Sequence, residues 1–230
     1  MKNTLINRKA TIKVAKALGE LCDEVVFVGG AMVSLYIDDP HAEDIRPTKD
    51  IDLTFQITTA SELERIRLAL NEKGFKEAAD SKVTCRFHYE DLLVDVMSTQ
   101  EVGWAPGNQW FLKGFDQAMA VTLEDVRINL LPLPYFVATK FDAFFDRGVD
   151  DVYGSKDLED LVYLFNHTST VVKDLTVAPD DVRLYLIEAV NRLKTNDSAM
   201  AAIPGHLFYE NMEEQYQEIK QKLEDLSNEL

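Results

Sequence analysis

Two aspartates at the start of a strand-like segment are the first side chains that could do chemistry. Asp50 and Asp52 flank Ile51 where apolar and polar residues alternate over 51–57, a pattern that predicts a half-buried strand. Side chains two positions apart on a strand share a face, so the two carboxylates are expected side by side. Such neighbours repel each other unless a cation lies between them, and Mg²⁺ prefers oxygen ligands. A solvent-facing pair is the simpler interpretation of so short a motif.

A third carboxylate makes the metal interpretation stronger. Asp95 interrupts the apolar run 92–97, and a lone Asp on an apolar face is unfavourable unless it is paired or bound to a metal. Two interpretations stay open: an ion pair with Arg86 on the preceding predicted strand, or a role as a ligand beside Asp50 and Asp52. If the two strands are neighbours, the three carboxylates suit a site for two Mg²⁺ or Mn²⁺ ions.

A Gly-Gly pair precedes these aspartates. Gly29 and Gly30 lie between a predicted strand, 25–28, and a segment with helical spacing, 31–37. Glycine lets the backbone approach a phosphate closely, and a helix N-terminus presents N–H groups to an anion. The pattern is not G-x-G-x-x-G, which excludes a dinucleotide-binding site of the Rossmann type. Because Gly-Gly is also ordinary in turns, its order relative to the aspartates is what indicates nucleotide chemistry.

The elements that must position these residues fall into two predicted domains, an α/β domain over 1–131 and a helical domain over 132–230. In the first domain we expect helices over 5–20 and 61–73, and the second of these has a possible capping box of Ser61 and Glu64. We expect strands over 25–28, 51–57, 83–89, 92–97 and 126–131. Glu90-Asp91 is the expected turn of a hairpin. After Pro132 and Pro134, helical spacing recurs over 135–147, 156–165, 180–193 and 207–226.

The composition predicts a folded cytoplasmic protein. Of its 230 residues 46% are hydrophobic and 28% are charged, proportions typical of a globular chain. No apolar run approaches the ~20 residues of a membrane span, and residues 1–16 lack the apolar core of a secretory signal. The two cysteines, Cys22 and Cys85, form no C-x-x-C pattern, so we expect neither a disulfide framework nor a structural zinc site.

The net charge of −16 limits the nucleic-acid partners that the sequence supports. An acidic protein gains nothing from general phosphate attraction, so such a partner would need a local basic surface. On the first predicted helix, Lys9, Lys13 and Lys16 share one face next to Arg8 and are the candidate. A solvated helix face is the more common explanation of such a cluster.

Two blocks resemble a known family. The stretch 28–55, with Gly29-Gly30 and then Arg46-Pro47-Thr48-Lys49-Asp50-Ile51-Asp52, resembles the signature of the DNA-polymerase-β-like nucleotidyltransferases. Its Arg-x-Thr-x-Asp-Ile-Asp form is similar to the AbiEii-like branch, which holds abortive-infection and type IV toxin nucleotidyltransferases. The second block, Ala138-Thr139-Lys140-Phe141-Asp142-Ala143 followed by Arg147 and Lys156–Leu161, is similar to a block of the same branch. The resemblance covers roughly 28–165.

The resemblance implies an α/β (α+β) fold, with a polymerase-β-like core on a mixed sheet and a helical C-terminal half that completes the nucleotide site. It implies that the metal ligands are Asp50, Asp52 and Asp95, and that the nucleotide-binding residues are Gly29, Gly30, Arg46, Thr48, Lys140 and Asp157, with Lys140 also catalytic. The chain departs from the pattern at Ala31, where many relatives have Ser, and at Lys156, where Arg is common. From the residues alone, Lys140 either extends to solvent or faces a buried anion, because it shares a helix face with Phe136 and Phe144.

The implied function is a metal-dependent nucleotidyltransferase that moves a nucleoside monophosphate from an NTP to an acceptor hydroxyl, with Mg²⁺ or Mn²⁺ as cofactor. The branch further implies an RNA acceptor, such as a tRNA 3′ end, and a toxin with a cognate antitoxin. Two alternatives stay open. One is a catalytically inactive scaffold with the same fold, and the other is an enzyme that nucleotidylates a protein or a small molecule.

Overall fold

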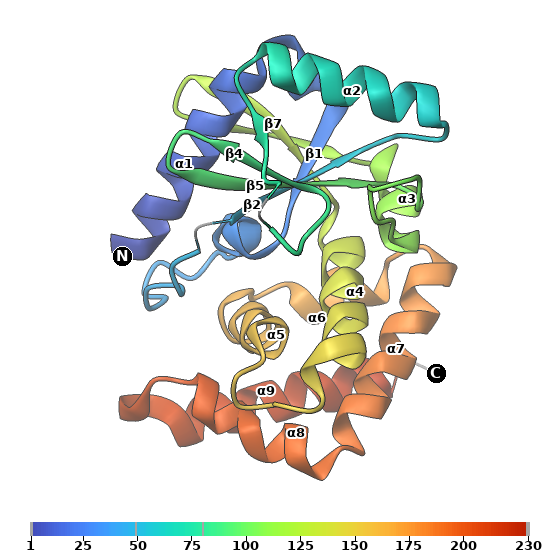
Figure 1. The fold of residues 1–230 in the computed structure, drawn as a ribbon. Coiled ribbons are helices and arrows are strands. Elements are labelled where there is room, and N and C mark those ends of the chain that lie inside the picture. Colours follow the sequence, from blue (N-terminus) through green and yellow to red (C-terminus); the bar gives the residue numbers. More distant parts are fainter. Residues whose placement is uncertain (1, 49, 80, 229–230) are drawn as a thin grey trace. The chain divides into compact units, whose positions relative to one another are not determined.

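The computed structural model describes residues 2–48, 50–79 and 81–228, and it divides into two compact units (Figure 1). Unit 1 consists of Met1–Met32 and Asp44–Pro132, and unit 2 consists of Val33–Glu43 and Leu133–Leu230. Unit 1 is built on a sheet, and the long elements of unit 2 are helices. The fold class expected from the sequence, a mixed α/β part followed by a helical part, is confirmed.

The sheet of unit 1 is mixed, with seven strands among the described residues in the order β3-β4-β5-β2-β1-β7-β6. Its strands are β1 (Val25–Val28), β2 (Asp50–Phe55), β3 (Lys76–Glu77), β4 (Arg86–Tyr89), β5 (Leu92–Ser98), β6 (Met119–Leu123) and β7 (Val126–Leu130). The pairs β2–β5 and β1–β7 are parallel, and the other neighbours are antiparallel. The central strand β2 therefore lies between β1 and β5.

Helices cover one side of this sheet. Unit 1 contains α1 (Lys2–Leu18), the 3₁₀ helix η1 (Gly19–Glu24), α2 (Ala60–Glu72) and α3 (Gln109–Phe115), and Figure 1 shows α1 and α2 on the same side of the sheet. Ile51, Leu53 and Val94, on the sheet face opposite to the aspartates, are fully buried. The helix expected over 31–37 is instead a short 3₁₀ helix, η2 (Gly30–Leu35), because so short a segment does not offset the cost of nucleating an α-helix.

Two tight hairpins of the sheet turn on a Glu-Asp pair. The hairpin expected at Glu90-Asp91 joins β4 to β5, and the sequence prediction missed a second one, in which Glu124-Asp125 joins β6 to β7. Each turn places its Glu in the left-handed region, at φ 52° for Glu90 and φ 54° for Glu124. Such a backbone suits a two-residue hairpin because its twist matches that of the strands.

The turns also bind the lysines of α1. The ammonium of Lys13 lies 2.6 Å from carboxylate oxygens of both Glu90 and Asp91, and that of Lys16 lies 2.9 Å from Asp125. Two members of the predicted basic face therefore neutralise acidic turns of their own unit. The continuous phosphate-binding track suggested by the sequence is reduced to Arg8 and Lys9.

Unit 2 is built from helices of unequal length. They are α4 (Leu133–Ala143), which continues as the π-helix η3 (Phe144–Gly148), then α5 (Lys156–His167), α6 (Val171–Thr176), α7 (Asp180–Lys194), α8 (Asp197–Ala202), η4 (Ile203–His206), η5 (Tyr209–Asn211) and α9 (Met212–Ser227). Pro134 falls in the first turn of α4, where the missing N–H has no helical acceptor to lose. The helix expected over 207–226 begins only at Met212. None of the helices in the described part of the chain has the length and apolarity of a membrane span.

The N-terminus of α2 is closed by a different residue from the one predicted. Thr59 accepts a hydrogen bond from the backbone N–H of Glu62, whose carboxylate accepts one from the backbone N–H of Thr59. This reciprocal pair is a capping box. The predicted box of Ser61 and Glu64 was wrong by two residues, because Thr59 and Ser61 both have an acidic residue three positions later.

We predict that Thr59→Ala lowers the free energy of unfolding by about 1 kcal/mol, because the N–H of Glu62 loses its acceptor. Ser61→Ala is the matched control, since Ser61 is an exposed residue inside the same helix. Urea unfolding of both variants measures the difference. An equal loss in the two would mean that Thr59 does not cap α2.

Candidate active site

The three candidate aspartates lie on one face of two adjacent strands. Strands β2 and β5 are parallel neighbours, and Asp52 is the direct Cα partner of Asp95. Asp50 precedes Asp52 by two residues and is paired with Leu93, so its side chain leaves the sheet on the same face. The adjacency that the metal interpretation required is therefore present.

Arg86 extends this row on the next strand. It is the Cα partner of Asp95 in the antiparallel pair of β4 and β5. Its Nε and one terminal nitrogen each donate to a different oxygen of Asp95 at 2.7 Å, and the same terminal nitrogen lies 3.5 Å from Oδ2 of Asp50. The hydrogen bonds to Asp95 raise the pKa of the guanidinium. The ion pair that the sequence left open as an alternative is thus formed.

The donors of this cluster suit a hard divalent cation, but their arrangement also includes a competitor. Carboxylate oxygens are the ligands that Mg²⁺ and Mn²⁺ prefer. Among the described residues, no three Asp, Glu, His or Cys side chains are arranged so that they could hold a metal ion as they stand. Both oxygens of Asp95 accept hydrogen bonds from Arg86, so the donor chemistry fits a cation that would share this carboxylate with the guanidinium.

Gly29 lies directly against Asp52. Its φ is +74°, in the left-handed region that glycine adopts without a steric penalty. A Cβ atom placed on Gly29 would overlap with the carboxylate of Asp52. Strand β1 ends at Val28, the Cα partner of Asp52, so the strand register brings the Gly-Gly turn to the carboxylates. Gly30 follows as the first residue of η2.

The loop before β2, which carries Arg46 and Thr48, is held by α1. The buried Asn7 donates to the carbonyl of Arg46 at 3.3 Å and accepts from the backbone N–H of Thr48 at 3.2 Å. Thr48 in turn accepts from the backbone N–H of Asp50 at 3.3 Å. Lys49, also in the sequence motif, lies outside the described residues. Asn7 is a positioning residue that the sequence analysis missed, because a single Asn in a helix carries no recognisable spacing.

Asp44 ties the beginning of this loop to the N-terminus of α1. Its carboxylate accepts from the backbone N–H groups of Asn3 and Thr4 and from the Thr4 hydroxyl, at 2.7 to 3.0 Å. Desolvation raises the pKa of Asp44, but these hydrogen bonds outweigh it and lower the pKa to about 2. A carboxylate at a helix N-terminus also interacts favourably with the helix dipole. The loop is thus fixed at both ends before Asp50 is reached.

In unit 2, the residues of the second sequence block form a buried ion-pair network. The ammonium of Lys140 lies 2.7 Å from Asp160 and 3.6 Å from Asp157, and Arg147 donates to Asp157 at 2.9 Å. The side chain of Lys140 is only 7% exposed, so it does not extend to solvent. The buried anion that it faces is supplied by α5. Asp160 was not among the predicted site residues, although its spacing of three from Asp157 puts both on one helix face.

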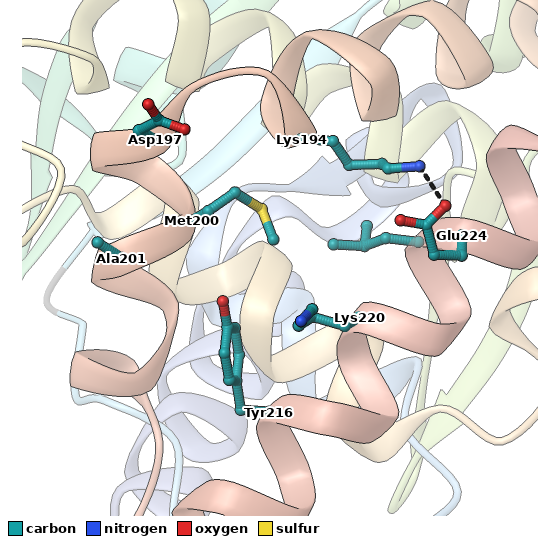
Figure 2. Close-up of a pocket in the computed structure, with 8 residues that line it drawn as sticks. Lys194, Asp197, Met200, Ala201, Tyr216, Lys220 and Glu224 are labelled. Atoms are coloured by element: carbon teal, nitrogen blue, oxygen red, sulfur yellow. Dashed lines mark hydrogen bonds and ion pairs between the residues drawn. The ribbon is translucent and has the colours of Figure 1, made fainter.

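A shallow pocket in unit 2 is separate from the sequence motifs. It lies among α7, α8 and α9, and Figure 2 shows Met200, Tyr216 and Lys220 around it, with the ion pair between Lys194 and Glu224 along one side. None of the residues that line it belongs to the two motif blocks. We therefore leave this pocket out of the candidate site.

The sequence profile of one protein family, described as nucleotidyl transferase AbiEii toxin of the type IV toxin–antitoxin system, matches residues 14–229. The chain belongs to the AbiEii family. Both motif blocks lie inside the matched range. No curated protein matches the chain in sequence.

Several solved structures are similar to this AbiEii-family chain at low sequence identity. A Helicobacter pylori protein provisionally described as a nucleotidyltransferase is 16% identical with a TM-score of 0.50, over 99% of this chain and 96% of its own. The protein JHP933 from Helicobacter pylori is 16% identical with a TM-score of 0.49, over 99% and 93%. The antibiotic-resistance factor ANT(2″)-Ia is 13% identical with a TM-score of 0.48, over 81% and 96%.

In this AbiEii-family protein, we predict that Gly29→Ala destabilises unit 1 more than Gly19→Ala does. Both glycines have positive φ, 74° and 55°, and each substitution carries a penalty of about 1–2 kcal/mol for the left-handed backbone. A Cβ at Gly19 would meet only the flexible end of Lys73, at 3.2 Å, whereas one at Gly29 would displace Asp52. Urea unfolding measures the difference, and equal losses would contradict the contact between Gly29 and Asp52.

Proposed function

We propose that this AbiEii-family protein transfers a nucleoside monophosphate from an NTP to the 3′-hydroxyl of an RNA, with Asp50, Asp52 and Asp95 binding Mg²⁺ or Mn²⁺. Family membership establishes the reaction class, with the NTP substrate and antitoxin context that the family implies. The observation that carries the residue assignment is the direct pairing of Asp52 with Asp95 on adjacent parallel strands.

The charge of the cluster supports a divalent cation. Three carboxylates and the Arg86 guanidinium carry a formal charge of minus two when all are ionised. Like charges on one sheet face destabilise the fold unless a further cation binds among them. Mg²⁺ or Mn²⁺ bound by these carboxylates would reduce that repulsion, beyond what the pairing of Arg86 with Asp95 does.

The proposed reaction is a displacement at the α-phosphorus of the NTP. The acceptor oxygen forms a bond to the α-phosphorus while the bond to the bridging oxygen breaks, and pyrophosphate leaves with that electron pair. Bound metal ions would neutralise the triphosphate and favour the deprotonated acceptor hydroxyl. We assign the triphosphate to the backbone at Gly29 and Gly30 and to Arg46 and Thr48, since the backbone of glycine can approach phosphate oxygens closely.

The RNA acceptor is proposed from the sequence resemblance and from the surface charge. It rests on the toxin branch that the two sequence blocks resemble and on Arg8 and Lys9, which are exposed on α1. The net charge of −16 and the binding of Lys13 and Lys16 to acidic turns argue for a small RNA footprint. A 3′ end meets that requirement better than a long duplex does.

The acceptor prediction is tested by incubating the protein and Mg²⁺ with α-labelled NTPs and, separately, total RNA, protein extract or a metabolite fraction. We expect label in RNA, and we expect it to be lost in Asp52→Asn and in the presence of EDTA. Label only in polypeptide or only in a metabolite would replace RNA with that acceptor. Full labelling by Asp52→Asn would reject the metal-ligand assignment.

We further propose that Lys140 contributes positive charge to the triphosphate and that Asp157 helps to bind the nucleotide. Support comes from their places in the second sequence block and from the burial of both side chains in one network. The rival is a purely structural role, because a buried lysine between Asp157 and Asp160 is also what a stable ion-pair network needs. Lys140→Ala alone cannot separate the catalytic role from the structural role. It would also destabilise the fold, because the buried carboxylates of Asp157 and Asp160 would lose a positively charged partner.

The double variant Lys140→Met with Asp160→Leu separates them. Replacing a buried ion pair by apolar side chains of similar volume is often neutral or stabilising, so we expect the fold to survive, as judged by thermal unfolding. Transfer should nevertheless fall by roughly 10²–10³, the typical effect of removing one preorganised charge from a reacting phosphate. A stable double variant with wild-type turnover would show that Lys140 acts only as a structural partner of Asp160.

A further inference from the structure

We propose that Arg86 is a built-in counter-ion that competes with the divalent metal for Asp95 and thereby makes metal binding depend on the nucleotide. This proposal rests on the proposed function, because it takes Asp50, Asp52 and Asp95 as the metal ligands. It adds a residue that belongs to neither motif block of the sequence.

The geometry of the pair makes the competition direct. A guanidinium that binds a carboxylate in a fork engages both oxygens at once. Arg86 does this to Asp95 with two hydrogen bonds of 2.7 Å. A metal ion that takes Asp95 as a ligand must therefore share this carboxylate with a guanidinium whose positive charge repels it. The approach of the guanidinium to Asp50, at 3.5 Å, places the same positive charge beside a second ligand.

The backbone of Arg86 is fixed in the sheet, so only its side chain can move. It begins β4 and is the Cα partner of Asp95 in the strand pair. Its side chain is 20% exposed, against 13% for Asp95, so the pair is largely shielded from solvent and its attraction is only weakly screened. Displacement of the guanidinium would therefore leave its charge within the cluster.

Nucleotide binding shifts this competition in favour of the metal. A triphosphate supplies oxygen ligands to the metal, and it also offers Arg86 an anion whose geometry suits a guanidinium. Arg86 should therefore weaken metal binding most in the protein alone and least in the presence of nucleotide. Arg86 acts here as a positioning residue, through its hold on Asp95.

The test measures Mn²⁺ binding to the full-length protein by titration calorimetry, with and without a non-hydrolysable NTP analogue. Without nucleotide, we expect Arg86→Gln to bind Mn²⁺ at least roughly tenfold more tightly than wild type, because a unit positive charge a few ångströms from the ion is removed. Arg86→Lys keeps the charge but loses the forked hydrogen bonds, so its Mn²⁺ affinity should lie between those of wild type and Arg86→Gln. In the presence of the analogue, the difference in Mn²⁺ affinity between Arg86→Gln and wild type should be smaller.

A surface arginine of the same unit provides the matched control. Arg65 pairs with Glu24 at 2.8 Å, with 55% of its side chain exposed, and Arg65→Gln should bind Mn²⁺ as wild type does. If Arg86→Gln is too unstable to purify without metal, the comparison of Arg86→Lys with wild type decides. The Mn²⁺-induced rise in melting temperature should likewise be larger in the Arg86 variants than in wild type.

Two failures can be told apart with Asp52→Asn. If Asp52→Asn binds Mn²⁺ as tightly as wild type, the metal site itself is wrong and the proposed function loses its residue assignment. If Asp52→Asn loses Mn²⁺ binding while the Arg86 variants bind no more tightly than wild type, the metal site stands and the role of Arg86 is overturned. Equal tightening in Arg65→Gln would also overturn it, since the effect would then be one of general net charge.

Discussion

The repulsion among three carboxylates on one face of a sheet is the constraint on which the rest of unit 1 depends. Asp50, Asp52 and Asp95 cannot move apart, because Asp52 and Asp95 are direct partners in a parallel strand pair. Arg86 offsets part of that repulsion from the third strand along. The protein itself therefore supplies part of the positive charge that three neighbouring aspartates need.

The surrounding structure fixes this row by register. A shift of one residue in β2 would turn both of its aspartates to the opposite, buried face, so the strand must enter the sheet at a defined position. The capping of α1 by Asp44 and the two hydrogen bonds of Asn7 to the loop before β2 set that entry. On the β1 side of β2, the close fit of Gly29 against Asp52 sets the distance between the Gly-Gly turn and this carboxylate. Residues outside the chemistry thus determine where the carboxylates lie.

Patterns confined to one segment were predictable from the sequence, and pairings between segments were not. Strand β1 is found as predicted, because four buried residues between a polar stretch and Gly-Gly leave little choice. The shared face of Asp50 and Asp52 follows from strand periodicity, but the adjacency of β2 and β5 depends on a crossover that no local pattern encodes. Lys13 and Lys16 appeared as a basic face because their acidic partners are more than 70 residues away in sequence. Strand β6 was missed, since the sequence Met-Ala-Val-Thr-Leu is short and ends in a turn without glycine.

The charged cluster of unit 1 and that of unit 2 differ in the formal charges of the side chains that face each other. In unit 2, Lys140 and Arg147 face Asp157 and Asp160, so the network is formally neutral and needs no ligand to be stable. In unit 1, Arg86 pairs with Asp95 and lies near Asp50, and three carboxylates share one face of the sheet. A neutral buried network is a weak indicator of function, because many folds contain one. The aspartate cluster of unit 1 is the stronger indicator, because three carboxylates converge on one sheet face next to a turn at which Gly29 leaves no room for a Cβ atom.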